Sequence, residues 1–298
     1  MAVSPKEIRR RIKGVKSTKQ ITKTMEMVAA SKMRKAQNAA VQLRAYAEKA
    51  LEIINSLGGR TMDFSHPLLT KREIKHTTVV LITSDRGLCG GLNTNVINKI
   101  YEEVKNLPKT SVKFITMGKK GRDAMMRLGY KVEADFSGLK KYEYTDAFPM
   151  IKMALEEFTA GKTDKLLIAY PQFINVMTQK PTVTTLLPLS PENIMGIVKD
   201  IIGEEEEVAH KKHFVYKFEP SPDAILSTLL PKLTEMQVYK AVLETQASEH
   251  SARMSAMRNA TDAAEEIIDG LTLSYNQARQ AGITREIAEI SSAADALK

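Results

Sequence analysis

Residues that interrupt helices are confined to the middle of this 298-residue chain. No proline lies between Pro5 and Pro67, and none follows Pro231, whereas ten of the 15 glycines lie between Gly87 and Gly203. Proline and glycine are the strongest local breakers of helical structure. The two flanks are therefore predicted to be long helices, and the middle of the chain is predicted to hold shorter elements.

The first flank has a start signal and a stop signal. Ser4 is a candidate N-cap, and Pro5 fits the first helical position because its missing N–H has no partner there. Gly58 and Gly59 form a strong C-terminal stop. Between these signals the helix would be on the order of 80 Å long, at 1.5 Å per residue.

Apolar residues follow steps of four and three along this flank. The predicted seam is Met25, Ala29, Lys32, Ala36, Ala39, Leu43, Tyr46, Ala50, Ile53 and Leu57. Only Lys32 breaks its apolar character. Upstream, Ile8, Ile12 and Val15 have the same spacing, and the register is expected to slip before Ile21.

The second flank repeats the pattern after a cap candidate, Ser221-Pro222-Asp223. Its predicted seam is Leu226, Leu229, Leu233, Met236, Lys240, Leu243, Ala247, His250, Met254, Met257, Thr261, Ala264, Ile268, Leu271, Tyr275, Ala278 and Gly282. A period of 3.5 residues predicts a left-handed coiled coil. Residues 1–57 carry 13 basic and 4 acidic side chains, and residues 221–298 carry 7 and 11. These opposite charges favour packing of one flank on the other.

The middle of the chain alternates strand and helix patterns. Strands are expected at 77–83, 112–116, 166–170 and 182–187, and helices at 93–105, 122–128 and 144–159. This alternation predicts a small α/β sheet with helices packed on it. The expected division is a helix over 1–58, an α/β domain over 75–195 and a helix with a short lead-in over 210–298.

Candidate catalytic and metal-binding residues do not assemble into a site. The loop 84–93 follows a strand, but it lacks the glycine spacing of both dinucleotide and P-loop motifs. Cys89, the only cysteine, has no neighbouring histidine in the sequence and is expected to be a buried thiol. His210 and His213 lack carboxylates at metal-ligand spacing. Glu286 and Glu289 fit a polar helix face better than an acid/base pair.

Four stretches of the sequence are distinctive, namely residues 21–36, 84–93, 246–254 and 283–297. They resemble the gamma subunit family of F-type ATP synthases, and the resemblance extends over essentially the whole chain. It implies a mixed α+β and α/β fold, with a long antiparallel left-handed coiled coil of the N- and C-terminal helices plus a central Rossmann-like α/β domain. Ala293 stands where the family usually has glycine, which predicts a stiffer helix tip.

The resemblance implies a non-catalytic central-stalk rotor that takes part in ATP synthesis and hydrogen ion transport. Its expected partners are the alpha and beta subunits of the catalytic hexamer, the epsilon subunit and the membrane ring of proton-carrying subunits. No cofactor, no metal and no nucleic acid are expected. No apolar run approaches the roughly 20 residues of a membrane span, and the resemblance implies a peripheral protein at the cytoplasmic face of the cell membrane.

Five interface residues follow from the same resemblance. Met25 and Arg253 are expected near the level where beta subunits push on the shaft. Gln280, Thr284 and Glu286 are expected near an upper contact. Two other functions stay open at this point, namely a Rossmann-like nucleotide-binding enzyme with helical oligomerisation arms and a basic coiled-coil protein that binds nucleic acid.

Overall fold

The computed structural model describes residues 4–57, 66–139, 143–189 and 221–296. The chain forms two compact units, one made of residues 1–30 and 253–298 and the other of residues 31–252. Helix α1 (Pro5–Leu57) and helix α6 (Pro222–Ala296) each contribute to both units. Gly58, Gly59, His210 and His213 lie outside the described residues, as does the start of the lead-in predicted from residue 210.

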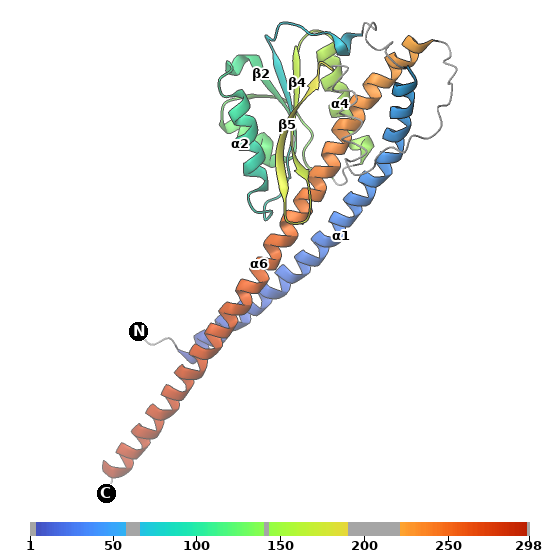
Figure 1. The fold of residues 1–298 in the computed structure, drawn as a ribbon. Coiled ribbons are helices and arrows are strands. Elements are labelled where there is room, and N and C mark those ends of the chain that lie inside the picture. Colours follow the sequence, from blue (N-terminus) through green and yellow to red (C-terminus); the bar gives the residue numbers. More distant parts are fainter. Residues whose placement is uncertain (1–3, 58–65, 140–142, 190–220, 297–298) are drawn as a thin grey trace. The chain divides into compact units, whose positions relative to one another are not determined.

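A five-stranded sheet forms the centre of the larger unit (Figure 1). The strands are β1 (Thr77–Ile82), β2 (Val112–Met117), β3 (Lys131–Asp135), β4 (Lys165–Phe173) and β5 (Gln179–Leu187). Their order is β3-β2-β1-β4-β5. The first four are parallel, and β5 pairs antiparallel with β4. In the register Val79 faces Phe114 on β2 and Leu167 on β4.

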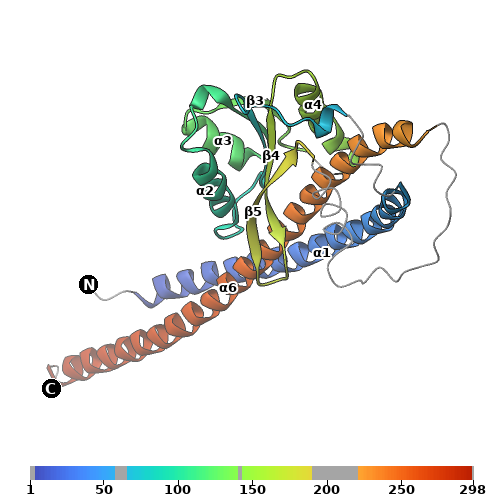
Figure 2. The same ribbon diagram turned by 45° about the horizontal axis from the view of Figure 1, so that its top comes forward.

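Helices cover both faces of this sheet. Successive side chains of a strand point to opposite faces, so neighbouring residues of β1 pack with different helices. Val79 and Leu81 pack with α2 (Leu92–Val104) and α3 (Lys119–Arg127). Val80 and Ile82 pack with α4 (Tyr144–Thr159) and with α6 residues between Leu229 and Val242. Figure 2 shows α2 and α3 on one side of the sheet and α4 on the other. The predicted mixed α/β class is thus confirmed, and four of the five strands of the sheet are parallel.

Two short 3-10 helices, Pro67–Leu69 and Lys109–Ser111, complete the described elements. The predicted strands and helices of the middle are all present, with α3 beginning three residues earlier than expected. Strand β3 was not predicted. Its sequence, Lys-Val-Glu-Ala-Asp, alternates charged and small apolar residues, and as an edge strand it leaves its ends exposed. A charged edge is a common protection against pairing with another sheet.

The helix caps agree with the sequence. Helix α1 begins at Pro5, and the carbonyl of Ser4 accepts from the N–H groups of Glu7 and Ile8. Helix α6 begins at Pro222, and the Ser221 hydroxyl accepts from Ala224 N at 3.2 Å. Pro231 lies inside α6, which continues past it. Among the described residues, the helices are each too short or too polar to cross a membrane.

The smaller unit contains two antiparallel segments, residues 4–30 of α1 and 253–296 of α6, called here the helix pair. Lys19 contacts Glu265, Thr22 contacts Thr261 and Glu26 contacts Arg258. Residue numbers therefore rise along one segment as they fall along the other. On α6, the least exposed positions from residue 257 onward include Met257, Thr261, Ala264, Ile268, Leu271, Tyr275, Ala278 and Gly282.

The seam of α1 agrees with the predicted one at Ile8, Ile12, Val15, Ala29 and Ala36 and departs from it between Val15 and Ala29 and at Lys32. Its less exposed positions, in steps of four and three, are Ile8, Ile12, Val15, Lys19, Thr22, Glu26, Ala29, Met33 and Ala36. The register does not slip before Ile21, which is 58% exposed. Lys32 is exposed, and Met33 takes the buried position. The predicted slip was wrong because the seam positions between Val15 and Ala29 are occupied by three polar residues, Lys19, Thr22 and Glu26, which an apolar pattern cannot reveal.

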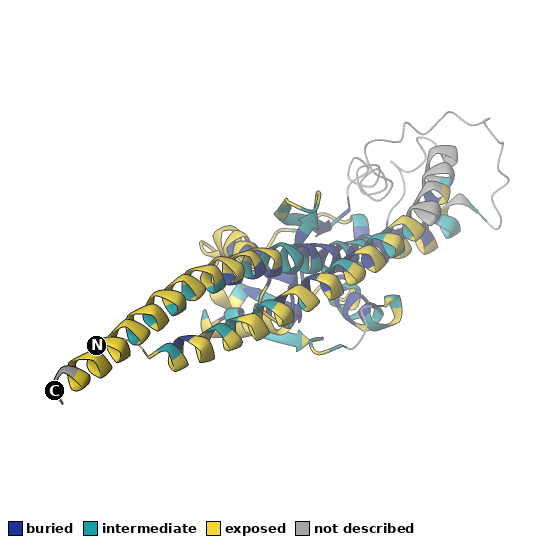
Figure 3. Ribbon diagram, turned by 90° about the horizontal axis from the view of Figure 1, so that it is seen from below, coloured by how far each residue is buried: buried dark blue, intermediate teal, exposed yellow. Residues whose placement is uncertain are grey.

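The end of α6 extends beyond its less exposed seam. From Ile283 to Ala294 every residue is exposed, as the colouring in Figure 3 shows. The apolar side chains of Ile283, Ile287 and Ile290 are 49%, 62% and 70% exposed. Their spacing of four and three places them on one face of the helix. At 1.5 Å per residue this bare end is about 20 Å long.

Candidate functional site

The loop between β1 and α2 is tied together by one side chain from the first turn of α2. Asn93 accepts from the buried N–H of Ser84 at 3.0 Å and donates to the Ser84 hydroxyl at 2.7 Å. It also donates to the Cys89 sulfur at 3.3 Å. Cys89 is 1% exposed, so the prediction of a buried thiol is confirmed. The side chains of Ser84, Cys89 and Asn93 are thus joined by hydrogen bonds.

The same loop presents an apolar side chain to solvent. Leu88 has a φ of +64° and is 62% exposed. A left-handed conformation is uncommon for a residue other than glycine. Gly90, two residues on, also has a positive φ of +58°. Two left-handed residues therefore lie within the connection between β1 and α2.

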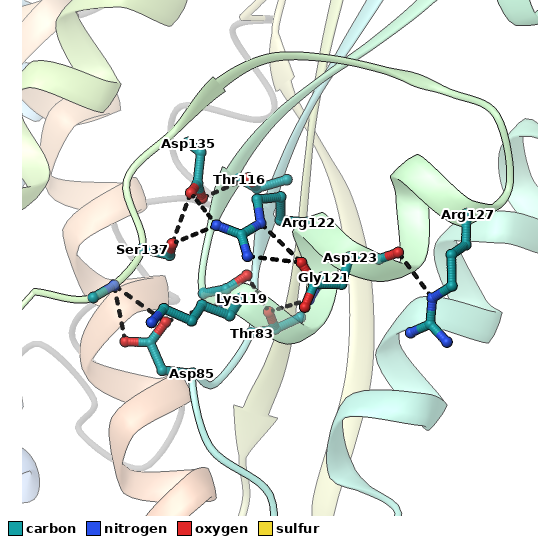
Figure 4. Close-up of polar contacts among 12 residues, drawn as sticks. Thr83, Asp85, Thr116, Lys119, Gly121, Arg122, Asp123, Arg127, Asp135 and Ser137 are labelled. Atoms are coloured by element: carbon teal, nitrogen blue, oxygen red, sulfur yellow. Dashed lines mark hydrogen bonds and ion pairs between the residues drawn. The ribbon is translucent and has the colours of Figure 1, made fainter.

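Asp85 joins the loops that follow β1, β2 and β3 at the carboxyl edge of the sheet (Figure 4). Its carboxylate accepts from the N–H of Lys119 at 3.0 Å, in the first turn of α3. It also accepts from the N–H of Gly138 at 3.0 Å, in the loop after β3. The amino end of a helix carries a partial positive charge, so the carboxylate occupies the place that an anionic ligand would take.

A second carboxylate at this edge lies at the end of β3. Asp135 accepts from Arg122 at 3.0 Å, from Ser137 at 2.7 Å and from Thr116 at 3.1 Å. Burial raises the pKa of Asp135, but hydrogen bonds from Ser137, Arg122 and Thr116 outweigh it and hold the pKa below its ordinary value. The arginine is thereby fixed to the protein's own carboxylate.

Close packing behind these carboxylates depends on glycine. Gly118, just before α3, has a φ of +107°, and a Cβ there would lie 2.1 Å from the carbonyl oxygen of Thr83. The Thr83 hydroxyl donates to the Gly118 carbonyl at 3.2 Å and accepts from the N–H of Gly121 at 2.9 Å. The end of β1 and the start of α3 are therefore in direct backbone contact.

The polar contacts between the two segments of the helix pair include a hydroxyl pair and two ion pairs. The hydroxyls of Thr22 and Thr261 lie 2.8 Å apart and are buried. Arg258 Nε donates to Glu26 Oε1 at 3.1 Å, and Lys19 Nζ lies 2.7 Å from Glu265 Oε1.

Glu26 is the most buried charged group in these contacts. Its side chain is 8% exposed, whereas that of Arg258 is 61% exposed. The hydrogen bond from Lys23, together with that from Arg258, outweighs the effect of burial and lowers the pKa of Glu26. The carboxylate is therefore held in its charged form inside the seam.

The five residues predicted at interfaces lie at two levels of α1 and α6. Met25 and Arg253 are half-buried, and Gln280, Thr284 and Glu286 are exposed. Met25 is next to the paired Glu26 in the sequence. The other three follow Arg253 on α6 by 27 residues or more, which is about 40 Å along a helix.

Thr284 and Gln280 are linked within α6. The Thr284 hydroxyl donates to the carbonyl oxygen of Gln280 at 3.0 Å, so their side chains belong to neighbouring turns. The polar partners Lys19, Thr22 and Glu26 were not predicted as functional. Continuing the step of four and three from Ile8 through polar residues would have found them.

In the parts of the chain that the structure describes, no group of three or more histidine, cysteine, aspartate or glutamate side chains could hold a metal ion. The carboxylates at the sheet edge are bound by arginine, hydroxyl and backbone N–H groups. The fold is thus a small Rossmann-like sheet flanked by very long terminal helices, and its phosphate-binding positions are filled by protein side chains. This combination defines a class of α/β proteins with long terminal helices.

Comparison with known proteins agrees with this class. A family model described as ATP synthase matches residues 4–297. The ATP synthase gamma chain of Heliobacterium modesticaldum is 43% identical over 295 residues, which are 98% of each chain. That of Alkaliphilus metalliredigens is 40% identical over the full length of both. The chain belongs to the ATP synthase gamma-chain family.

Solved structures share the fold. A chain of the mitochondrial ATP synthase from Euglena gracilis, in a cryo-EM structure of OSCP, F1 and the c-ring, superposes with a TM-score of 0.66. It is 23% identical, and the match covers 98% of this chain and 94% of that one. A central-stalk and c-ring structure from Tetrahymena thermophila gives a TM-score of 0.58 at 23% identity, covering 80% of this chain and 99% of that one.

Proposed function

We propose that this chain is the central-stalk rotor subunit of a proton-translocating F-type ATP synthase, and that it couples rotation of the membrane ring to conformational cycling of the catalytic beta subunits. The observation that carries this proposal is the 43% identity to an ATP synthase gamma chain along 98% of both chains. Because this identity extends over both terminal helices and the sheet, it supports the role of a gamma chain for the whole of this chain.

The helix pair acts in this proposal as a shaft inside the hexamer of alpha and beta subunits. Its two segments wind around each other as an antiparallel left-handed coiled coil, for which the steps of four and three along both seams are the support. The bare end of α6 reaches furthest into the hexamer. Its exposed isoleucines, 283, 287 and 290, would meet an apolar sleeve.

The sheet, within residues 75–195, acts as the foot of the rotor. It contacts the epsilon subunit and the ring of proton-carrying subunits, at the cytoplasmic face of the cell membrane, as a peripheral component. The helix predicted over 1–58 and the one over 210–298 connect this foot to the catalytic hexamer. Charged edges such as β3 suit a surface that meets polar loops of other subunits.

Turning of an asymmetric shaft favours a different state of each beta subunit in turn. A rotor shifts a conformational equilibrium only by contacting the open and closed states differently. The chain itself supplies no catalytic residue in this mechanism. Met25 and Arg253 act at the level where beta subunits push on the shaft, and Gln280, Thr284 and Glu286 act at the upper contact.

A nucleotide-binding enzyme with helical arms is the alternative, and the sheet edge argues against it. A phosphate bound at the amino end of α3 would meet the carboxylate of Asp85, which already accepts from Lys119 N. A phosphate in the loop after β1 would compete with Asn93 for the Ser84 N–H. Like charges and occupied donors both oppose such binding.

The test uses membranes from cells that carry the variant chain as their sole copy. Met25→Lys places a charge at a half-buried position, and Arg253→Glu reverses one. Both variants are expected to retain ATP hydrolysis and to pump fewer protons per ATP. Met25→Leu and Arg253→Lys, which keep the volume or the charge, serve as matched controls.

Two results would each overturn one part of the proposal. One is full coupling of hydrolysis to pumping in both charge variants, which would remove these residues from the interface. The other is failure of an affinity-tagged chain to recover alpha and beta subunits and a magnesium-dependent ATPase from detergent-solubilised membranes. The second result would remove the rotor function itself.

A further inference from the structure

The apolar seam of the helix pair is shallow where its polar contacts lie. Ala29 and Ala264 are buried at 2% and 5% exposure, and neither side chain can fill a deep hole on the facing helix. Small seam residues allow two helices to approach closely, but they distinguish poorly between one register and another. Something other than apolar shape must therefore set the register at this level.

We propose that Lys19, Thr22 and Glu26 on α1, with Glu265, Thr261 and Arg258 on α6, form a register lock for the helix pair. All six side chains are paired across the two helices in the observed register. The inference rests on the proposed function only in its consequence, which is that a locked pair transmits torque without sliding.

The charges favour the observed register over the two registers that are shifted from it by seven residues. A slide of seven residues in one direction brings Glu26 opposite Glu265, and a slide in the other direction brings Lys19 opposite Arg258. Each alternative therefore sets like charges against each other where the observed register sets opposite charges. Like charges at contact distance are destabilising, the more so for a partly buried group.

The buried hydroxyls of Thr22 and Thr261 also favour the observed register. In the observed register each buried hydroxyl finds the other at 2.8 Å, and Thr261 also donates to the carbonyl oxygen of Met257 at 2.8 Å. After a slide of seven residues Thr22 would face Ile268 or Met254 instead. Each hydroxyl would then keep only its backbone acceptor, the carbonyl oxygen of Lys19 for Thr22 and that of Met257 for Thr261, and the bond between the two hydroxyls would be lost. A single polar pair in an apolar seam is an established way to fix the register of helices.

The decisive variant exchanges the two charges on α1, as Lys19→Glu with Glu26→Lys. In the observed register this double variant meets like charges twice. In each register shifted by seven residues, one introduced residue meets an opposite charge. In the first, the lysine at position 26 lies opposite Glu265. In the second, the glutamate at position 19 lies opposite Arg258. The matched control adds Arg258→Glu and Glu265→Lys, which restores both opposite-charge pairs in the observed register while keeping the altered residues on α1.

The register is measured by double electron–electron resonance on the purified full-length chain. Nitroxide labels are placed at the exposed Ser17 and Ala281 through cysteines, with the buried Cys89 replaced by alanine. The labelled positions are offset by about 21 Å along the pair in the observed register. A slide of seven residues changes this offset by about 10 Å.

We expect one narrow distance for the parent chain, a shifted or broadened distribution for the double charge exchange, and recovery of the parent distance in the fourfold exchange. An unchanged distance in the double exchange would overturn the lock, and so would failure of the fourfold exchange to restore it. Since no partner subunit is needed, failure here leaves the rotor function standing, and loss of alpha and beta subunit binding leaves the lock standing.

Discussion

Gly118 should be among the least replaceable residues of the sheet, and its replacement by alanine separates two kinds of strain. Its φ of +107° is a conformation that other residues rarely adopt, and this alone costs about 1–3 kcal/mol. In addition, the new Cβ would lie 2.1 Å from the Thr83 carbonyl oxygen. Relief requires the end of β1 to move away from α3.

That movement disrupts the hydrogen bonds of the Thr83 hydroxyl with Gly118 and Gly121, at about 1 kcal/mol each. We therefore expect Gly118→Ala to lower the free energy of opening of the sheet by about 3–5 kcal/mol. Two other glycines are matched controls. Gly129 has a φ of +82°, and its added Cβ would meet only Lys109 Nζ, at 3.4 Å. Gly87 has no positive φ, and its added Cβ would meet nothing within 4 Å.

Gly129→Ala should therefore cost about 1–3 kcal/mol from backbone conformation alone, and Gly87→Ala should change stability by less than about 0.5 kcal/mol. Hydrogen-exchange mass spectrometry of peptides from β1 and β2 reports the opening of the sheet separately from the long helices. For Gly118→Ala, protection should fall by roughly two to four orders of magnitude. A loss no greater than that of Gly129→Ala would refute the role of the close backbone contact.

Three further changes test other parts of the structure. Asn93→Ala leaves the buried Ser84 N–H without its acceptor, which costs about 1–3 kcal/mol, and should speed the labelling of Cys89 by a maleimide. Hydrogen bonds outweigh burial and lower the pKa of Asp135 in the folded state. The carboxylate therefore stabilises the fold fully above the pKa that Asp135 has in the unfolded chain, and this stabilisation is lost as the pH falls through the lower pKa of the folded state. Thermal unfolding of Asp135→Asn should depend less on pH in that acidic range than the parent chain. Gly14→Ala, in an open helical position, should stabilise α1 by about 0.5–1 kcal/mol, measured as slower amide exchange there.

The sheet was predictable where burial requires continuous apolar runs. Residues 77–82 are buried on both faces, and a strand in such a position reads as an unbroken run of Val, Ile, Leu and Thr. Strand β3 has only partial burial along its length, so its composition carries little signal. Its position beside β2 follows from the connection through α3, which a sequence pattern does not contain.

The polar part of the helix pair could not be predicted from the apolar periodicity. Thr22 and Glu26 look like surface residues until Thr261 and Arg258 are placed opposite them. These partners lie more than 230 residues away along the chain. The apolar seam of α6 was predicted correctly, because from residue 257 onward most of its positions are apolar and one helix is sufficient to reveal them.

The wide sequence separation within the helix pair also constrains biosynthesis. Thr22 leaves the ribosome 239 residues before its partner Thr261, which corresponds to roughly 10–50 s of translation. Throughout that interval the first helix has no complementary segment, and its inner face is open to water and to other nascent chains. That face is less apolar because it includes the polar residues Lys19, Thr22 and Glu26. The residues that later join the two helices therefore also lower the tendency of the first helix to aggregate before its partner is synthesised.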